Sequence, residues 1–587
     1  MRKILTVLWP FLLALFGGGL LALCFAPFNW ADLVWLAPVL WMAAFWLGKG
    51  ERRPRRKGFF LGWLAGLAFW SINLKWLATV TGGTYLILAA YLALYFAFFG
   101  LFVSSAGNPF RKERPDGTRM AEALRSLGFA ALNAGFWCGL EWIRGWMLTG
   151  FGWNGLGVAF HDRLPLAQGA ELVGVTGLAF LPVFLAGVMV QVGVRLGKGV
   201  QAGKMQRHWD FAVAILLLVV CFTYGVFRTV FINRSAGDTL RVLLVQMDIP
   251  QSAGHVEWSG EEVHEGYEGE TLRALAEVDA RNEKRIAEAE GEVELESVDW
   301  VVWPEVVLYG ILLNGGGDEF ALYEPSSSTL QRMREAGVRN LMAGIWEVEA
   351  ERVEGGLRPT QENGSQYNAL LSVNPAGELA THRKQHLVIY GEFIPFVDSV
   401  KWLGDIYEKV AGVPWGGNLG RGVGSEGLTL PGAGGEVNII PSICFEDTVP
   451  RVTRKFSKGE REVIVNITND GWFGTSEGSQ QHFDNALFRA IELRRPMLRA
   501  ANRGVTGAVS ATGSLVDYET GKKQVMLDEE EKPFVRGSIL TKVKIPERGG
   551  PTLYARAGDW FSVLGLVVAV GWMIRCLGCC RGKGKIS

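Results

Sequence analysis

The feature that most constrains this fold is a series of apolar runs near the length of a membrane span. A spanning helix needs about 20 consecutive, mostly apolar residues. Such runs lie at residues 4–24, 33–48, 58–78, 84–105, 126–147, 173–195, 210–231 and 558–575. The run at 33–48 is short for a complete span. The pattern predicts a polytopic α-helical membrane domain with about eight spans.

Between the seventh and eighth runs, the chain has the composition of a soluble protein. The hydrophobic fraction of 49% and the charged fraction of 20% are therefore averages over an apolar region and a soluble region. We predict a membrane domain with seven transmembrane helices at 1–235, an extracytoplasmic domain at 238–545, an eighth transmembrane helix at 555–577 and a basic cytoplasmic tail at 578–587. The formal net charge is zero, which gives no electrostatic support for a nucleic-acid partner.

The Lys and Arg content of the loops predicts the orientation, because these residues accumulate on the cytoplasmic side of a membrane. With eight spans, the basic loops 49–57, 111–119 and 195–207 all fall on one side, together with the C-terminal tail. The alternate loops 25–32 and 79–83 contain no Lys or Arg. We therefore predict that both termini are cytoplasmic and that the soluble domain faces outward.

Strands that alternate with helices in the soluble region indicate an α/β layered architecture. We predict strands at 240–247, 298–305, 340–346, 367–375, 437–443 and 463–470, and helices at 259–297, 327–336, 450–457 and 482–502. The Gly-rich stretch 411–435 is interpreted as a loop. Most of the predicted strands are continuous apolar runs, which indicates sheets buried on both faces.

Three reactive side chains lie at predicted strand ends or in a tight loop: Glu305, Lys384 and Cys444. Cys444 alone among the seven cysteines lies in the soluble region, so it has no partner there for a disulfide. One interpretation is a small buried hydrophobe, a common fate of a free cysteine. The other is a nucleophile, because a nearby Lys⁺ lowers a thiol pKa and stabilises an oxyanion, while a carboxylate moves the proton.

The motifs around these residues carry a resemblance to a known family. "WPE" with Glu305, "RKQHLVIYGEFIPF" with Lys384 and "ICFED" with Cys444 resemble the Glu-Lys-Cys triad of the nitrilase superfamily. Eight spans around such a domain resemble the apolipoprotein N-acyltransferase family. The resemblance implies a nitrilase-like α-β-β-α sandwich in which Glu305 is the general base, Lys384 the oxyanion stabiliser and Cys444 the nucleophile.

The same resemblance implies further site residues. Glu392 in "YGEF" and Glu446 in "CFED" match supporting carboxylates that would position the triad. The residues implied in substrate binding are Phe445 and Trp472 near the acyl pocket, Trp153 in a membrane loop and Trp258 as the candidate substrate-gating tryptophan. The chain has Ile389 and Tyr390 where the family usually has Pro-Phe, and its acidic segment 259–297 is longer than usual.

The run at 126–147 carries two charged residues, Glu141 and Arg144, on one helical face. Charges in a span usually face a partner or a cavity. They predict either a structural ion pair or a contact with lipid headgroups. Trp153 follows in a loop rich in Gly and Trp, where we expect it at the level of the headgroups.

The resemblance implies a two-step acyl transfer at the bacterial inner membrane, with the catalytic domain on the periplasmic side. The implied donor is a phospholipid, and the implied acceptor is a diacylglyceryl apolipoprotein at the bilayer surface. We expect a monomer without cofactor. No metal is expected either, because the sequence has no Cys/His cluster with metal-ligand spacing.

Three alternatives remain open. A membrane-tethered amidohydrolase with the same triad would use water as acceptor, although eight spans exceed what a tether needs. A transporter with an outer accessory domain would be favoured by internal repeats among the spans, and we find none. A nitrilase-like scaffold without activity is disfavoured because Glu305, Lys384 and Cys444 are all present.

Overall fold

The computed structural model divides into two compact units. One comprises Met1–Val230 and Arg556–Ser587, and the other comprises Phe231–Ala555. The structure describes residues 2–47, 53–111, 118–201, 207–252, 255–289, 291–317, 319–360, 366–395, 397, 402–411, 417–432, 434–546 and 550–582. Residues 583–587 of the predicted basic tail and parts of the predicted basic loops lie outside the described residues.

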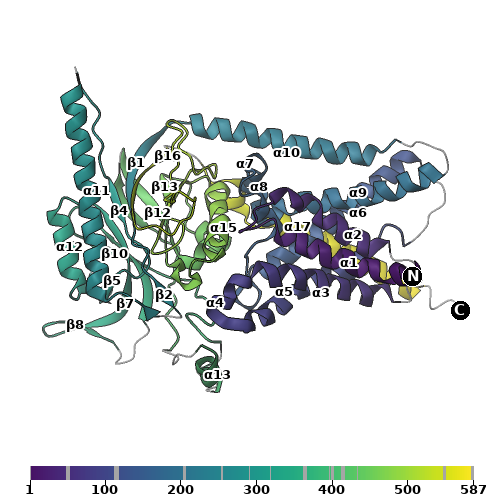
Figure 1. The fold of residues 1–587 in the computed structure, drawn as a ribbon, viewed down its shortest axis with the longest axis horizontal. Coiled ribbons are helices and arrows are strands. Elements are labelled where there is room, and N and C mark those ends of the chain that lie inside the picture. The colour runs from purple at the N-terminus through teal and green to yellow at the C-terminus, as the bar shows by residue number, and fades with distance from the viewer. Residues whose placement is uncertain are drawn as a thin grey trace. The chain divides into compact units, whose positions relative to one another are not determined.

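The first unit is built from helices at the predicted apolar runs (Figure 1). The longer ones are α1 (Arg2–Ala22), α2 (Ala37–Trp46), α3 (Pro54–Asn73), α5 (Tyr85–Val103), α6 (Arg119–Arg144), α9 (Phe180–Gln201), α10 (Trp209–Arg234) and α17 (Trp560–Gly582). The shorter ones are α4 (Ala78–Thr81), α7 (Leu164–Ala167) and α8 (Ala170–Leu178), and the chain passes from the second unit to the first within α16 (Leu553–Ala557). The apolar runs therefore form helices, as predicted.

Fewer of these helices than predicted have the length and hydropathy of a membrane span. Among the described residues, four helical segments are long and apolar enough to cross a membrane: Lys75–Val103, Phe180–Gln201, Trp209–Arg234 and Trp560–Leu577. The prediction of eight spans is therefore not confirmed. The run at 33–48 departs most from its prediction, because its α-helix α2 has only 10 residues, about 15 Å of helix.

Glycines allow two helices of this unit to approach closely. Gly58, Gly62 and Gly66 lie on one face of α3, four residues apart. A Cβ atom on Gly62 would lie 2.2 Å from the Phe96 carbonyl oxygen of α5. A Cβ atom on Gly66 would lie 2.8 Å from Cα of Ala93 on the same helix. Small residues at this spacing are typical of helices that pack backbone to backbone in membranes.

The second unit contains two sheets of unequal size. The strands of the larger one lie in the order β10 (Leu379–Arg383), β9 (Gln366–Val373), β7 (Leu341–Val353), β4 (Trp300–Val302), β1 (Gly237–Gln246) and β16 (Gly537–Pro546), with β5 (Leu308–Asn314), β6 (Phe320–Leu322) and β8 (Gly356–Pro359) attached off this path. The strands β1, β4 and β7 are parallel neighbours. β10 runs in the same direction, because β9 is antiparallel to both β7 and β10.

The smaller sheet has the order β11 (Leu428–Gly432), β12 (Gly435–Ile443), β13 (Glu462–Thr468), β14 (Met497–Ala501) and β15 (Gly507–Val509). Its three central strands are parallel. A two-stranded ribbon is formed by β2 (Gln251–Ser252) and β3 (His255–Val256). The helices of this unit are α11 (Gly260–Glu288), α12 (Ser326–Glu335), α13 (Trp402–Ala411), α14 (Pro450–Arg454) and α15 (Gly478–Leu493).

Two apolar cores hold these layers together. One core lies between the sheets, where Val242 of β1 and Val302 of β4 share a cluster with Ile439 of β12 and Val465 of β13. The other lies between the large sheet and the helices, where Tyr267 of α11 packs. The helices α14 and α15 pack against the smaller sheet. The unit is thus an α-β-β-α sandwich, as predicted.

Two predicted elements are wrong. The helix expected over 482–502 ends at Leu493, and β14 begins at Met497. Pro496 cannot continue a helix, and Arg494 closes α15 in the left-handed conformation with φ of 54°. The Gly-rich stretch 411–435 was expected to be a loop, but it contains β11, which pairs with β12. Residues 412–416 and 433 of this stretch lie outside the described residues.

Candidate active site

The three predicted triad residues meet at the ends of strands. Lys384 directly follows β10, Cys444 directly follows β12, and Glu305 lies three residues after β4. Lys384 Nζ is 3.5 Å from Glu305 Oε1, and both side chains are buried. The Cys444 thiol lies close enough to both groups for their charges to shift its pKa. The carboxyl ends of strands from both sheets therefore bring carboxylate, ammonium and thiol together.

Two further side chains hold the Glu305–Lys384 pair in position. Lys384 Nζ donates to Glu392 Oε1 at 2.7 Å, and the backbone N–H of Val388 donates to Glu392 Oε2 at 2.8 Å. Asn368 Nδ2 donates to Glu305 Oε1 at 2.7 Å. Lys384 thus lies between two carboxylates, and the contact with Glu392 holds its ammonium group beside Glu305.

Glu446 connects the Lys384 loop to the Cys444 turn. Its Oε1 accepts hydrogen bonds from the backbone N–H groups of Gln385 at 2.7 Å and His386 at 2.8 Å. Its Oε2 accepts one from the N–H of Ile443 at 2.9 Å. One buried carboxylate therefore connects the residues next to Lys384 with the residue before Cys444.

Cys444 lies at a strained turn between β12 and the 3₁₀ helix Cys444–Thr448. Its φ of 53° is uncommon for a residue with a side chain. The carbonyl of Cys444 accepts a hydrogen bond from Asn466 Nδ2 at 3.3 Å, and the same amide donates to Ser442 Oγ at 3.1 Å. Backbone strain of this kind clusters at functional sites, where surrounding contacts maintain it.

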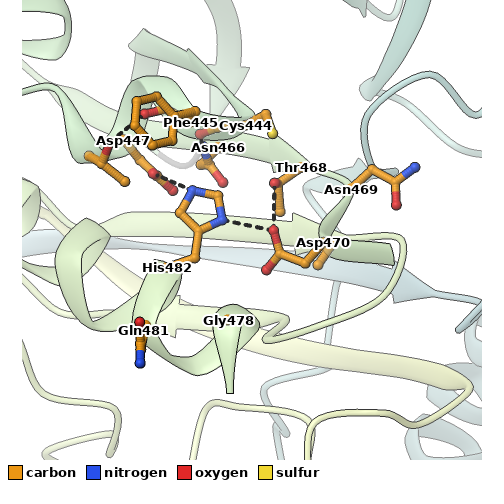
Figure 2. A network of polar contacts seen from close by, with 12 residues as sticks. Cys444, Phe445, Asp447, Asn466, Thr468, Asn469, Asp470, Gly478, Gln481 and His482 are labelled. Carbon is orange, nitrogen blue, oxygen red and sulfur yellow. Dashed lines mark hydrogen bonds and ion pairs between the residues drawn. The ribbon is translucent and has the colours of Figure 1, made fainter. Parts of the chain in front are cut away.

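Figure 2 shows a buried network of charged side chains next to this turn. His482 on α15 lies between two carboxylates, with Nε2 2.9 Å from Asp447 Oδ1 and Nδ1 2.8 Å from Asp470 Oδ1. Arg499 on β14 pairs with both of these aspartates. Burial alone would lower the pKa of His482, but Asp447 and Asp470 raise it to about 9. His482 is therefore protonated at neutral pH, and two cations balance two carboxylates.

The pKa of the Cys444 thiol is raised, whereas a nearby Lys⁺ was expected to lower it. Burial and the Glu305 carboxylate raise the pKa of the Cys444 thiol, and they outweigh the opposing effect of Lys384. Burial also raises the pKa of Glu305, against Lys384 and the Asn368 hydrogen bond, which lower it. Burial lowers the pKa of Lys384, but Glu392, Cys444 and Glu305 raise it well above its usual value. The Cys444 thiol is therefore neutral and needs a base. Glu305 is the neighbouring carboxyl group, and the ammonium group of Lys384 keeps its charge beside them.

The predicted substrate-binding aromatics of this unit lie in different settings. Phe445 is half-buried beside Cys444, and its ring stacks on His386 with centroids 6.0 Å apart. Trp472 is 42% exposed in the 3₁₀ helix Asp470–Phe473. Trp258 packs against the core on the helix-covered face of the large sheet, under the Arg536 guanidinium, whereas Cys444 packs against the core between the sheets. A gating role for Trp258 stays a prediction.

Trp153 belongs to the first unit, where it is fully buried, and its place at the level of the headgroups stays a prediction. Its ring packs on Trp76 at 5.1 Å, and its carbonyl accepts a hydrogen bond from Arg144 at 2.7 Å. Glu141 accepts from the backbone N–H of Leu156 at 2.8 Å. Both charged residues are buried and bonded to the loop that carries Trp153, which favours the structural interpretation of Glu141 and Arg144.

Sequence reasoning missed Asn368 and the network around His482. The available signal for Asn368 was a single amide within the apolar strand "YNALLSV". The signal for the network was weaker, because Asp447, Asp470, His482 and Arg499 come from four separate segments. Only the fold brings their charges together.

Comparison with known proteins identifies both parts of the chain. The family model for the apolipoprotein N-acyltransferase N-terminal domain matches residues 17–188, and the model for carbon-nitrogen hydrolases matches residues 248–536. An apolipoprotein N-acyltransferase from Geobacter metallireducens is 28% identical over 582 residues, covering 96% of this chain and 95% of that protein. The chain belongs to the apolipoprotein N-acyltransferase family.

Other relatives in the apolipoprotein N-acyltransferase family are similarly distant. The protein from Rhizobium leguminosarum bv. trifolii is 29% identical over 561 residues, covering 91% of each chain. Among solved structures, a variant of the amidase from Nesterenkonia AN1, of the nitrilase superfamily, is 13% identical with a TM-score of 0.31, covering 55% of this chain and 94% of that one. The matched carbon-nitrogen hydrolase region contains Glu305, Lys384 and Cys444, and the matched N-terminal region contains Trp153.

Proposed function

We propose that this protein transfers a fatty acyl chain from a phospholipid, through a thioester on Cys444, to the α-amino group of the lipidated N-terminal cysteine of an apolipoprotein. The observation that carries the proposal is the buried cluster of Glu305, Lys384 and Glu392 beside the Cys444 thiol. It occurs in a chain that also matches the N-terminal domain of apolipoprotein N-acyltransferases. Transfer of an acyl group to the N-terminus of a lipoprotein is the last step of its maturation.

The first half-reaction charges the enzyme. Glu305 accepts the thiol proton of Cys444, and the sulfur attacks the ester carbonyl carbon of the phospholipid. The carbonyl oxygen becomes an oxyanion, which the Lys384 ammonium stabilises. The carbon–oxygen bond to the glycerol then breaks. Glu305 returns the proton to the departing oxygen, so that a lysophospholipid leaves and an acyl thioester remains on Cys444.

The second half-reaction uses the same groups. The neutral α-amine of the apolipoprotein attacks the thioester carbon, and Glu305 accepts a proton from the nitrogen. Lys384 again stabilises the oxyanion. The carbon–sulfur bond breaks, the amide forms, and the thiolate of Cys444 recovers a proton from Glu305. The raised pKa of Lys384 keeps its charge through both steps.

The proposal includes a membrane arrangement. The apolar helices would cross the bacterial inner membrane eight times, with both termini in the cytoplasm and residues 238–545 on the periplasmic side. The basic loops support this orientation. Both lipid substrates are anchored in the bilayer, so that an active site at the outer leaflet would reach both of them. A monomer suffices for this chemistry.

The experiment that tests the proposal follows the acyl chain. Purified protein is incubated with a phospholipid and a synthetic diacylated lipopeptide that has a free N-terminus. We expect the intact mass of the lipopeptide to rise by one acyl group while a lysophospholipid accumulates. Release of free fatty acid with an unchanged lipopeptide would instead indicate an amidohydrolase-like enzyme that uses water as acceptor, and would reject the proposal.

A further inference from the structure

Two arginines lie at the edge of the candidate active site without a role in the acyl-transfer steps above. We call Arg421, Arg451 and His386 the cationic rim. Both arginine side chains are exposed, whereas His386 is buried. The ring of His386 stacks on Phe445, the residue next to Cys444. The cationic rim is therefore connected to the nucleophile through one aromatic contact.

Arg421 is held in position by the backbone on both sides of it. The N–H of Gly420 donates to the Gln366 carbonyl at 2.9 Å, and the N–H of Gly422 donates to the Lys384 carbonyl at 2.8 Å. A Cβ atom on Gly422 would lie 2.2 Å from the Arg383 carbonyl oxygen, so that only glycine fits there. The loop that carries Arg421 is thus bound to the residue that supplies the ammonium group of the triad.

The guanidinium of Arg421 has no anionic partner among the residues that the structure describes. Its Cζ lies 4.6 Å from the centroid of the Phe393 ring, which supports the side chain from one side. The opposite face and the N–H groups remain available to a ligand, because the residue is exposed. An arginine held on an aromatic ring presents a planar set of donors that matches phosphate oxygens.

Arg451, near the start of α14, contacts the third member of the rim. Its Nη2 lies 3.4 Å from His386 Nδ1. Burial, followed by the charges of Arg451, Lys384 and Arg421, lowers the pKa of His386 to about 3. His386 is therefore neutral at physiological pH, and the positive charge at this edge comes from the two arginines together with Lys384.

We propose that the cationic rim binds the phosphate of the phospholipid donor. The inference rests on the proposed function, because it requires a phospholipid ester at Cys444. In a glycerophospholipid, only the glycerol backbone separates the phosphate from the ester carbonyls. A phosphate held by Arg421 and Arg451 would therefore orient an ester toward the thiol of Cys444, the residue next to Phe445. The rim recognises the phosphodiester itself, so that donors with different headgroups share it.

The test compares two donors that differ only in the phosphorylated headgroup. Acyl-enzyme formation is measured in detergent micelles with a phospholipid and with the diacylglycerol that carries the same acyl chains. Wild-type enzyme should prefer the phospholipid. Arg421→Gln and Arg451→Gln should each reduce the ratio of the two kcat/KM values by about tenfold, because each removes charge-assisted hydrogen bonds to phosphate. Arg358→Gln, on the remote strand β8, is the matched control and should leave the ratio at the wild-type value.

Several outcomes would overturn the inference. An unchanged ratio in both variants would show that the rim does not contact the phosphate, even if both donors react more slowly. Equal inhibition of the two donors by millimolar inorganic phosphate would indicate a site for free phosphate instead of a lipid headgroup. A wild-type enzyme that forms no acyl-enzyme with either donor would reject the proposed function itself, which separates that failure from a failure of the rim.

Discussion

At the scale of single residues, Asn368 lowers the pKa of the proposed base, Glu305. We expect it to do so without contacting the substrate. Its amide donates to Glu305 Oε1 at 2.7 Å and lowers the pKa of that carboxyl against the larger effect of burial. The base must be ionised to accept a proton, so that activity falls as the pH drops through this pKa. Because the net pKa shift is upward, the acidic loss of activity should begin above the pH at which an ordinary glutamate is protonated.

Asn368→Ala removes the hydrogen bond that favours the ionised carboxyl. We expect the acidic limb of the pH–rate profile for acyl-enzyme formation to move to higher pH. The control Asn374→Ala alters an exposed turn whose amide bonds to Glu378, and its profile should match the wild type. An acidic limb that stays in place or moves to lower pH in Asn368→Ala would contradict the assignment of Glu305 as the base.

Glu446 supports a second prediction at this scale. Its carboxylate accepts hydrogen bonds from three backbone N–H groups, which belong to two segments about 60 residues apart in the sequence. Glu446→Gln keeps the shape of the side chain, but it replaces one of the two accepting oxygens with an NH₂ group that cannot accept a hydrogen bond from a backbone N–H. We expect a loss of about 2 kcal/mol in the free energy of unfolding, since hydrogen bonds to charged groups contribute roughly 1.5–3 kcal/mol each.

The measurement for Glu446→Gln is the melting temperature, together with hydrogen exchange at the amides of Gln385, His386 and Ile443. Both the lower melting temperature and faster exchange at these three amides are expected. Glu354→Gln changes an exposed side chain in the β7–β8 turn and should affect neither. Unchanged exchange at all three amides in Glu446→Gln would show that the carboxylate does not hold the Lys384 loop to the Cys444 turn.

At the scale of elements, the charged network joins α15 and β14 to the turn that carries Cys444. The pKa of His482 is raised to about 9 from an ordinary value near 6.5. A raised folded-state pKa stabilises the fold fully below the unfolded pKa, and this stabilisation is lost as the pH rises through about 9. The effect amounts to roughly 3 kcal/mol.

We therefore expect His482→Gln to destabilise the protein most below about pH 6.5. The difference in melting temperature between wild type and variant should shrink as the pH rises, and should be smallest above about pH 9. Thermal unfolding across this pH range provides the measurement. A difference that is constant with pH, or that grows toward alkaline pH, would show that His482 is not held in its protonated form by Asp447 and Asp470.

The same elements indicate how far the sequence allows prediction. The apolar runs of β1, β12 and β13 stand out because both of their faces are buried, and the triad could be inferred from short motifs. β14 could not be inferred in the same way, since "RRPMLRAAN" contains three arginines that suggest an exposed helix. In the fold, Arg495 is buried against Glu462, and Arg499 against Asp447 and Asp470.

Long-range pairing explains what else the sequence did not reveal. The thiol pKa was expected to be lowered by Lys384, but the burial of Cys444 and its contact with Glu305 are properties of the folded state. The contacts of Glu446 with Gln385 and His386, and that of Asn368 with Glu305, likewise join residues distant in sequence. A local pattern indicates which residue types are present, whereas the register of two sheets determines which of them meet.

At the scale of the whole molecule, the proposed orientation in the membrane rests on the charges of the loops. We expect Glu354→Cys, an exposed position in the β7–β8 turn, to react with a membrane-impermeant thiol reagent added outside intact spheroplasts. The variant is made in a Cys444→Ser background, and that background alone is the control. Labelling of Glu354→Cys only after the membrane is permeabilised would place residues 238–545 in the cytoplasm and reject the proposed topology.

The central claim is that Cys444 carries the acyl chain, and intact-mass spectrometry of the enzyme tests it most directly. After incubation with phospholipid and no acceptor, the wild-type mass should increase by one acyl group. The modification should map to Cys444, should disappear with neutral hydroxylamine, and should be transferred when the diacylated lipopeptide is added. Cys444→Ser should gain no hydroxylamine-sensitive mass. A wild-type enzyme that acylates the lipopeptide without an adduct on Cys444, or a Cys444→Ser variant with normal transfer, would contradict the account.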